Sequence, residues 1–180
     1  MPLSTRKLVL LVASLASLAA LAVPPAATPA RATTHVTLSS LEAGVLQQLN
    51  GIRVQHRLVP LRLSARLTAS AAQHSEEMGT KGYFDHQSAN GTAFWKRIAR
   101  WYGSAHYHYW SVGENMLWSS PDIDPASALQ IWMASPEHRH NILDPTWREI
   151  GISAVHFASA PGTYGGEPTT IVTTDFGVRH

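Results

Sequence analysis

The 180-residue chain contains no cysteine, so no disulfide bond can stabilise its fold. A chain of this kind needs an ordinary apolar core. Apolar residues make up 44% of the sequence, and the length suits one domain of roughly 100 to 200 residues. We therefore expect a single domain that is held together by packing alone.

The first 32 residues have the order of features that is typical of a signal peptide. Arg6 and Lys7 precede a mainly apolar run over 8–23, and the small-residue sequence Ala30-Arg31-Ala32 follows. The apolar run is shorter than the roughly 20 residues that a membrane-spanning helix needs. We predict cleavage after Ala32 and an exported, extracellular protein without a stable membrane span, with an uncleaved anchor as the alternative.

Cleavage would also change the net charge. The whole chain has a formal charge of +2, but removal of Arg6, Lys7 and Arg31 from its fourteen Lys and Arg leaves eleven against twelve Asp and Glu. The remaining basic residues do not form a clustered basic motif. We therefore expect no nucleic-acid partner.

After a short disordered lead over 33–38, the folded domain is predicted to cover 39–180. Several segments have apolar residues at helical intervals together with capping residues. They are 39–56, which opens with the capping-box pair Ser39 and Glu42, then 64–82, 93–101, a helix that begins at Asp124, and a short helix that begins at Ser135.

Strand-like composition appears between and after these helices. Aromatic and β-branched residues favour strands at 106–112, 149–157 and 169–178, and a Gly- and Pro-rich loop joins the last two. There is no regular βαβ alternation. The pattern predicts an α+β domain in which helices pack on an antiparallel sheet.

Three clusters at the ends of predicted elements contain the side chains best suited to chemistry. They surround His86, Glu114 and His138. Two imidazoles and a carboxylate suit Zn²⁺ or another divalent metal and leave a coordination position open. For Glu114 the alternative is a tight turn in which the carboxylate only caps backbone amides. No H-E-x-x-H or C-x-x-C motif fixes a metal site by itself.

Several short motifs occur in a fixed order along the chain. They are Leu49-Asn50-x-x-Arg53, Gly82-Tyr83-Phe84-x-His86, Gly113-Glu114-Asn115, Trp132-x-x-Ser135-Pro136-x-His138-Arg139-x-Asn141-Ile142-Leu143, Glu149-Ile150-Gly151-Ile152 and Phe176-Gly177. Their order resembles the CAP superfamily, which comprises cysteine-rich secretory proteins, antigen 5 and pathogenesis-related proteins. The chain is similar to the short bacterial, SCP-like form of this domain.

The resemblance implies an α-β-α sandwich with a small antiparallel sheet between helical layers. It also implies a cleft lined by two His and two acids, in which His86 and Glu114 match the first of each. The other two positions depart from the family pattern, because Ser135 stands where the second acid is expected and the stretch 171–174 has no His. We predict His138 as the replacement imidazole, with Ser135 and Glu137 as further cleft candidates.

Two functions fit these residues. The first is a binding module whose cleft holds a divalent metal or a small molecule, and the resemblance adds lipid as a ligand class. The second is a hydrolase, a peptidase or esterase, in which metal-bound water, or water activated by Glu114 as general base, attacks an amide or ester. In that case His86 and His138 are metal ligands or proton carriers. A Ser-His-Glu arrangement using Ser88 or Ser135 ranks last because no strained nucleophile turn precedes either serine. The sequence predicts no oligomeric state.

Overall fold

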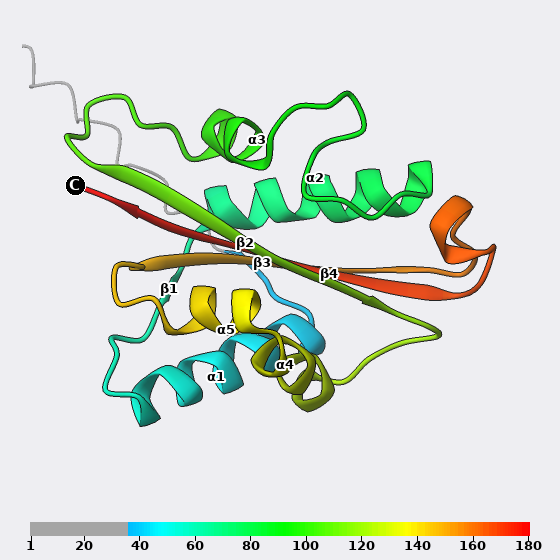
Figure 1. Cartoon of the computed structure of the whole chain (residues 1–180), viewed down its shortest axis with the longest axis horizontal. Coiled ribbons are helices and arrows are strands. Elements are labelled where there is room, and N and C mark those ends of the chain that lie inside the picture. Colours follow the sequence, from blue (N-terminus) through cyan, green and yellow to red (C-terminus); the bar gives the residue numbers. More distant parts are fainter. Residues whose placement is uncertain (1–35) are drawn as a thin grey trace, which may run out of the picture. The chain divides into compact units, whose positions relative to one another are not determined.

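The computed structural model describes residues 36–180, and these residues belong to one compact unit. The predicted signal peptide and its cleavage site lie outside the described residues. In chain order the elements are α1 (Ser40–Gln55), β1 (Arg62–Leu63), α2 (Ala65–Lys81), α3 (Phe94–Trp101), β2 (Trp110–Ser119), α4 (Pro125–Ala134), α5 (Pro136–Leu143), β3 (Glu149–Phe157), the 3-10 turn η1 (Gly162–Tyr164) and β4 (Thr169–Arg179) (Figure 1).

These elements form three layers. The sheet has the strand order β1-β3-β4-β2, with α2 and α3 on one face and α1, α4 and α5 on the other (Figure 1). This confirms the predicted α-β-α sandwich. The sheet is not wholly antiparallel, because the two-residue strand β1 pairs parallel with β3. Strand β2 lies at the opposite edge of the sheet.

The helix boundaries follow the capping residues in the sequence. At α1 the backbone N–H of Ser39 donates to Glu42 Oε2 over 2.8 Å, and the N–H of Glu42 donates back to Ser39 Oγ. Asp124 caps α4 by accepting from two backbone amides. Ser64 departs from the prediction, since its side chain caps no amide of α2.

The strand predicted at 106–112 lies later in the structure. Strand β2 starts at Trp110 and pairs with β4 without interruption from Trp110↔Arg179 to Ser119↔Thr170. Glu114 therefore lies inside a regular strand and not in a tight turn. Gly113 lies close to Trp147, because a Cβ at this position would lie 3.0 Å from Cζ2 of the indole and the ring would have to shift.

The larger part of the core fills the space between the sheet and the layer of α1, α4 and α5. Its members include the fully buried Trp132, Leu49, Ile150 and Phe176. On the other face α2 lies directly on the sheet, since a Cβ on Gly151 would come within 2.0 Å of the carbonyl carbon of Leu67. Both layers are therefore fixed against the strands that carry the candidate site.

None of the helices within residues 36–180 has the length and apolar character that crossing a bilayer requires.

Candidate functional site

A cleft runs along the edge strand β2, between the loop that follows α2 and the first turns of α5. It consists of two adjoining cavities of about 250 Å³ and 330 Å³. His86 lines both cavities. The first is also lined by Phe84, Asp85, Met116 and His138, and the second by Phe94, Val112, Gly113, Glu114, Asn141 and Trp147.

His86 is held in place by a chain of charged groups behind it. Its Nδ1 lies 2.8 Å from Oε1 of Glu114, and the other carboxylate oxygen of Glu114 is paired with the guanidinium of Arg97. Arg97 and Glu114 are both buried, whereas about half of the His86 side chain is exposed. Because Nδ1 contacts Glu114, Nε2 is the ring nitrogen of His86 that remains to bind a ligand in the cleft.

Arg97 also fixes the loop that carries His86. A guanidinium N–H donates to the backbone carbonyl of His86 over 3.0 Å, and the same nitrogen lies 3.4 Å from Ser88 Oγ. The sequence analysis did not predict a role for Arg97 in the site. The sequence feature that could have indicated one is its position on the third helix, where it follows Phe94 by three residues and so shares a face with it.

Charge pairing determines the protonation state of Glu114. Burial acts to raise the pKa of this carboxyl, but the hydrogen bond from His86 and the positive charge of Arg97 outweigh burial and lower it. Glu114 is therefore ionised at neutral pH, and its two oxygens are already occupied by partners.

His138 approaches the cleft from the opposite layer, in the first turn of α5. The side-chain amide of Asn115 donates to its backbone carbonyl over 3.0 Å, and Asn141 donates to both Asn115 Oδ1 and the carbonyl of Glu114. This amide network joins α5 to β2. Burial, followed by the nearby His86, lowers the pKa of His138, so the ring is neutral at pH 7. Its Nδ1 is buried and has no hydrogen-bond partner among the described residues.

The two further cleft candidates serve the helix instead. Ser135 is the N-cap of α5, where its Oγ accepts from the His138 N–H at 3.4 Å and donates to Glu137 Oε2 at 3.1 Å. Glu137 is exposed, and its carboxylate stabilises the helix N-terminus. Neither residue lines the two cavities of the cleft.

Two buried titratable groups lie beneath the cleft. His74 on α2 is fully buried, its Nε2 lies 2.9 Å from the carbonyl of Asp85, and burial lowers its pKa to about 4. Asp175 on β4 pairs in register with Glu114 and is also fully buried. Neither carboxyl oxygen of Asp175 has a hydrogen-bond partner among the described residues. Burial, and then the charge of Glu114, raise the pKa of Asp175 well above its usual range.

Replacing Asp175 with Asn is expected to stabilise the protein at pH 7. Above the unfolded-state Asp pKa of about 3.9 the unfolded chain loses this proton while the folded chain keeps it, so the contribution of Asp175 to stability falls by about 1.4 kcal/mol per pH unit until its folded pKa is reached. Asn has the same shape and stays neutral, so that loss disappears. Urea unfolding between about pH 4 and pH 7 measures the difference. Asp122→Asn, at an exposed site, is the matched control, and equal pH slopes in wild type and Asp175→Asn would contradict the expectation.

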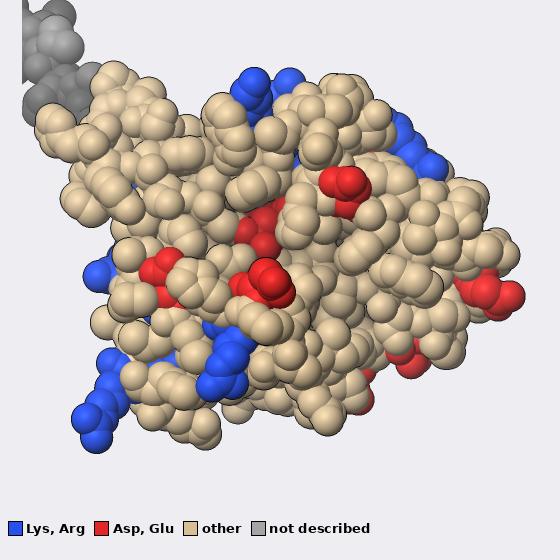
Figure 2. Space-filling model, in the orientation of Figure 1, with Lys and Arg blue, Asp and Glu red and all other residues tan. Residues whose placement is uncertain are grey.

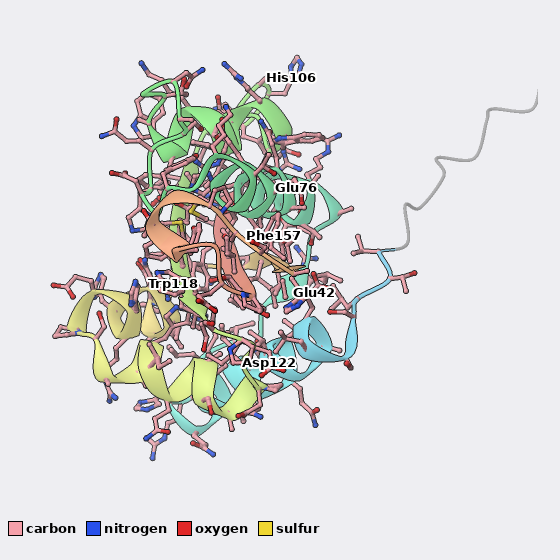
Figure 3. All side chains as sticks on the ribbon, turned by 90° about the vertical axis from the view of Figure 1, so that its right-hand side faces the viewer. Glu42, Glu76, His106, Trp118, Asp122 and Phe157 are labelled. Carbon is pink, nitrogen blue, oxygen red and sulfur yellow. The ribbon has the colours of Figure 1, made fainter. Side chains whose placement is uncertain are left out.

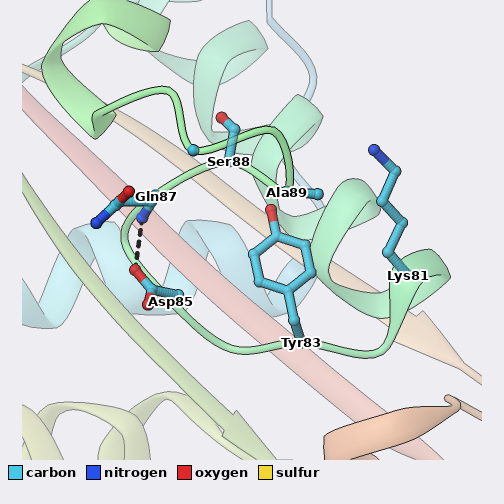
Figure 4. Close-up of a pocket in the computed structure, with 7 residues that line it drawn as sticks. Lys81, Tyr83, Asp85, Gln87, Ser88 and Ala89 are labelled. Carbon is cyan, nitrogen blue, oxygen red and sulfur yellow. Dashed lines mark hydrogen bonds between the residues drawn. The ribbon is translucent and has the colours of Figure 1, made fainter.

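A separate hollow of about 440 Å³ lies on the outer side of the same loop (Figure 4). The backbone N–H of Gln87 donates to Asp85 Oδ1 over 2.8 Å, and the Tyr83 hydroxyl donates to Glu77 Oε2 over 2.9 Å. Lys81 pairs with Glu77 at 2.7 Å. These contacts hold the loop that carries His86. We therefore interpret the residues that line the hollow as supports of this loop.

The donor set limits how a metal can bind here. Within residues 36–180 no group of three or more His, Asp and Glu side chains is arranged to hold a metal ion. Glu114 is buried and already contacts His86 and Arg97, one with each carboxylate oxygen. The side chains that remain toward the cavity are the imidazoles of His86 and His138, which line it together.

Known proteins resemble this chain in sequence and in structure. The protein YkwD of Bacillus subtilis is 33% identical over 124 residues, which are 68% of this chain and 46% of that protein. An extracellular protein containing an SCP domain from Bacillus anthracis is 26% identical, with a TM-score of 0.55, over 79% of this chain and 44% of that chain. This chain therefore spans less than half the length of either relative.

An outer surface protein of Borrelia burgdorferi shares the fold, with a TM-score of 0.61 at 18% identity over 76% of this chain and 90% of that one. A family model described as the cysteine-rich secretory protein family, CAP, matches residues 46–173. This match spans α2 to β3 and includes every residue placed in the cleft. The chain belongs to the cysteine-rich secretory protein (CAP) family.

Proposed function

We propose that the protein is an exported binding module whose cleft holds a divalent cation of the Zn²⁺ class on the imidazoles of His86 and His138. One observation carries this proposal, namely the buried Arg97–Glu114 pair that holds Nδ1 of His86. A carboxylate behind a histidine fixes its ring and raises the basicity of the opposite nitrogen, as in carboxylate–histidine–zinc sites. His138 adds a second imidazole, neutral at pH 7, on the same cavity.

The cleft has room for more than a cation. Its two adjoining cavities measure about 250 Å³ and 330 Å³, and together they fall within the roughly 300 to 1,000 Å³ of pockets for drug-sized molecules. A bound cation would present a Lewis acid to water or a small molecule in the remaining space.

Catalysis is not part of this proposal. The Glu-assisted form of the hydrolase alternative uses Glu114 as general base, but a carboxylate with a lowered pKa and a partner on each oxygen is a poor proton acceptor. Export is supported by the predicted signal peptide and by the extracellular and outer-surface descriptions of two structural relatives.

Calorimetric titration of residues 33–180 with Zn²⁺ tests the proposal. We expect one site that His86→Ala and His138→Ala each weaken by at least about tenfold and the double variant abolishes. His140→Ala, at an exposed histidine on the same helix, is the matched control and should bind as wild type. Glu114→Gln should weaken binding about 10- to 100-fold without abolishing it, because its role is to orient His86.

Two results would overturn the proposal. One is Zn²⁺ binding by the double histidine variant with wild-type affinity, and the other is binding that depends on His140 instead. Circular dichroism of every variant separates loss of the site from loss of the fold.

A further inference from the structure

We infer that the outer surface of α3 and the following loop 103–109 is a docking surface for a bilayer that contains anionic phospholipid. This surface, called here the aromatic-basic face, consists of the exposed side chains of Trp95, Lys96, Arg100, Trp101, Tyr107 and Tyr109. The inference is independent of the metal proposed for the cleft.

The first observation is the exposure of large aromatic side chains. Trp95 is 46% exposed, Trp101 42%, Tyr107 42% and Tyr109 44%, all within 15 residues of sequence. Tryptophan side chains are usually buried for most of their area, as Trp132 and Trp147 are here. Trp101 is also tied to α2, because its Nε1–H donates to Gln73 Oε1 over 2.7 Å, so Trp95, Tyr107 and Tyr109 carry the argument. Exposure of several large rings on one segment is typical of an interaction surface.

The second observation is the charge of the same segment. No Asp or Glu occurs between Asp85 and Glu114, while Lys96 and Arg100 are exposed on α3. Nζ of Lys96 lies 5.2 Å from the ring centre of Trp95, so a cation and an aromatic ring are presented together. Figure 2 shows basic and no acidic side chains over α3 on the visible face.

The third observation is that contacts with the C-terminus hold the loop against α3. The guanidinium of Arg179 lies 3.9 Å from the ring centre of Tyr102 at the end of α3 and 4.8 Å from that of Tyr107. Tyr109 stacks on His180 with ring centres 5.1 Å apart. In Figure 3 His106 lies at the upper end of the molecule, and Asp122 lies in its lower half.

These features match the chemistry of a membrane interface. Trp and Tyr rings prefer the headgroup region of a bilayer, and each Lys or Arg near an anionic surface contributes about 1 kcal/mol of attraction. A neutral polysaccharide could stack on the aromatic rings. Its affinity would not be increased by the charges of Lys96 and Arg100 or by the lack of Asp and Glu in this segment. The charge pattern therefore favours an anionic lipid surface.

The test uses residues 34–180, which contain the whole described core and leave out the apolar run 8–23 that would itself bind lipid. We expect co-sedimentation with vesicles containing about 30% phosphatidylglycerol and little with pure phosphatidylcholine. Raising NaCl from about 0.05 M to about 0.5 M should release the protein. Lys96→Gln with Arg100→Gln should weaken binding about 10- to 30-fold, and Trp95→Ser should also weaken it.

The matched control lies on the opposite layer, where Ile131→Ser with Arg139→Gln removes an exposed apolar and an exposed basic side chain. This pair should bind as wild type. The inference is overturned if the control pair loses binding, if Lys96→Gln with Arg100→Gln binds as wild type, or if the protein binds a polysaccharide and no vesicle. All of these positions are exposed, so the variants should keep the wild-type thermal midpoint.

Discussion

Replacing Arg97 with Met is expected to lower the free energy of unfolding by about 3 to 5 kcal/mol, because it leaves the buried carboxylate of Glu114 without its cation. Both side chains lie almost wholly out of contact with solvent. An ion pair at an exposed site would contribute at most about 1 kcal/mol to the free energy of unfolding. A larger loss in Arg97→Met would therefore show that the pair is buried. Urea unfolding monitored by circular dichroism measures it.

A double-mutant cycle separates the charge from the packing of Arg97. Glu114→Gln alone leaves Arg97 unpaired, whereas Arg97→Met combined with Glu114→Gln leaves no unpaired charge. We expect the double variant to be more stable than Arg97→Met. If the two single losses simply add, the ion pair does not explain the effect and the prediction is wrong.

Replacing Trp132 with Ala is expected to cost about 3 to 5 kcal/mol, because it removes a large aromatic side chain from a packed core. Trp132 is fully buried, and its Nε1 donates to the Met116 carbonyl over 3.1 Å, which ties α4 to β2. Trp132→Phe keeps much of the volume and loses the hydrogen bond, so it should cost less. Thermal unfolding and urea unfolding both measure the loss.

Trp95→Ala is the control for Trp132→Ala, since Trp95 lies on the exposed side of α3. Its effect on the free energy of unfolding should stay within about 0.5 kcal/mol. A similar loss at both positions would mean that Trp132 does not have the core role assigned to it.

The sequence predicted the helices well because their signals are local. Ser39, Asp124 and Ser135 each place a side-chain acceptor at the first turn, and each begins a helix in the structure. The start of β2 depends on a distant partner, since β4 ends at Arg179 and pairs with Trp110. Tyr109 still exchanges two backbone hydrogen bonds with His180. The aromatic residues before Tyr109 have strand-forming side chains but pair with no strand among the described residues, and they form the loop of the aromatic-basic face.

The candidate site was predictable only in part, for a related reason. The sequence placed His86, Glu114 and His138 in one cleft from the order of motifs, and all three line its cavities. The sequence did not give the direction of the Glu114 carboxylate, because this depends on Arg97, 17 residues away on another element. The buried Asp175 was also missed, since a strand of Thr, Asp and Val residues gives no sign of which face it buries.

The side chains that tie α4 and α5 to β2 also affect what the exposed edge of the sheet can do. Asn141 donates to the carbonyl of Glu114 and Trp132 donates to that of Met116, so two outward acceptors in the middle of the edge strand are already used. A strand from a second molecule would have to break both bonds to add itself there. A protein without disulfides thereby gains protection against fibril growth through this edge.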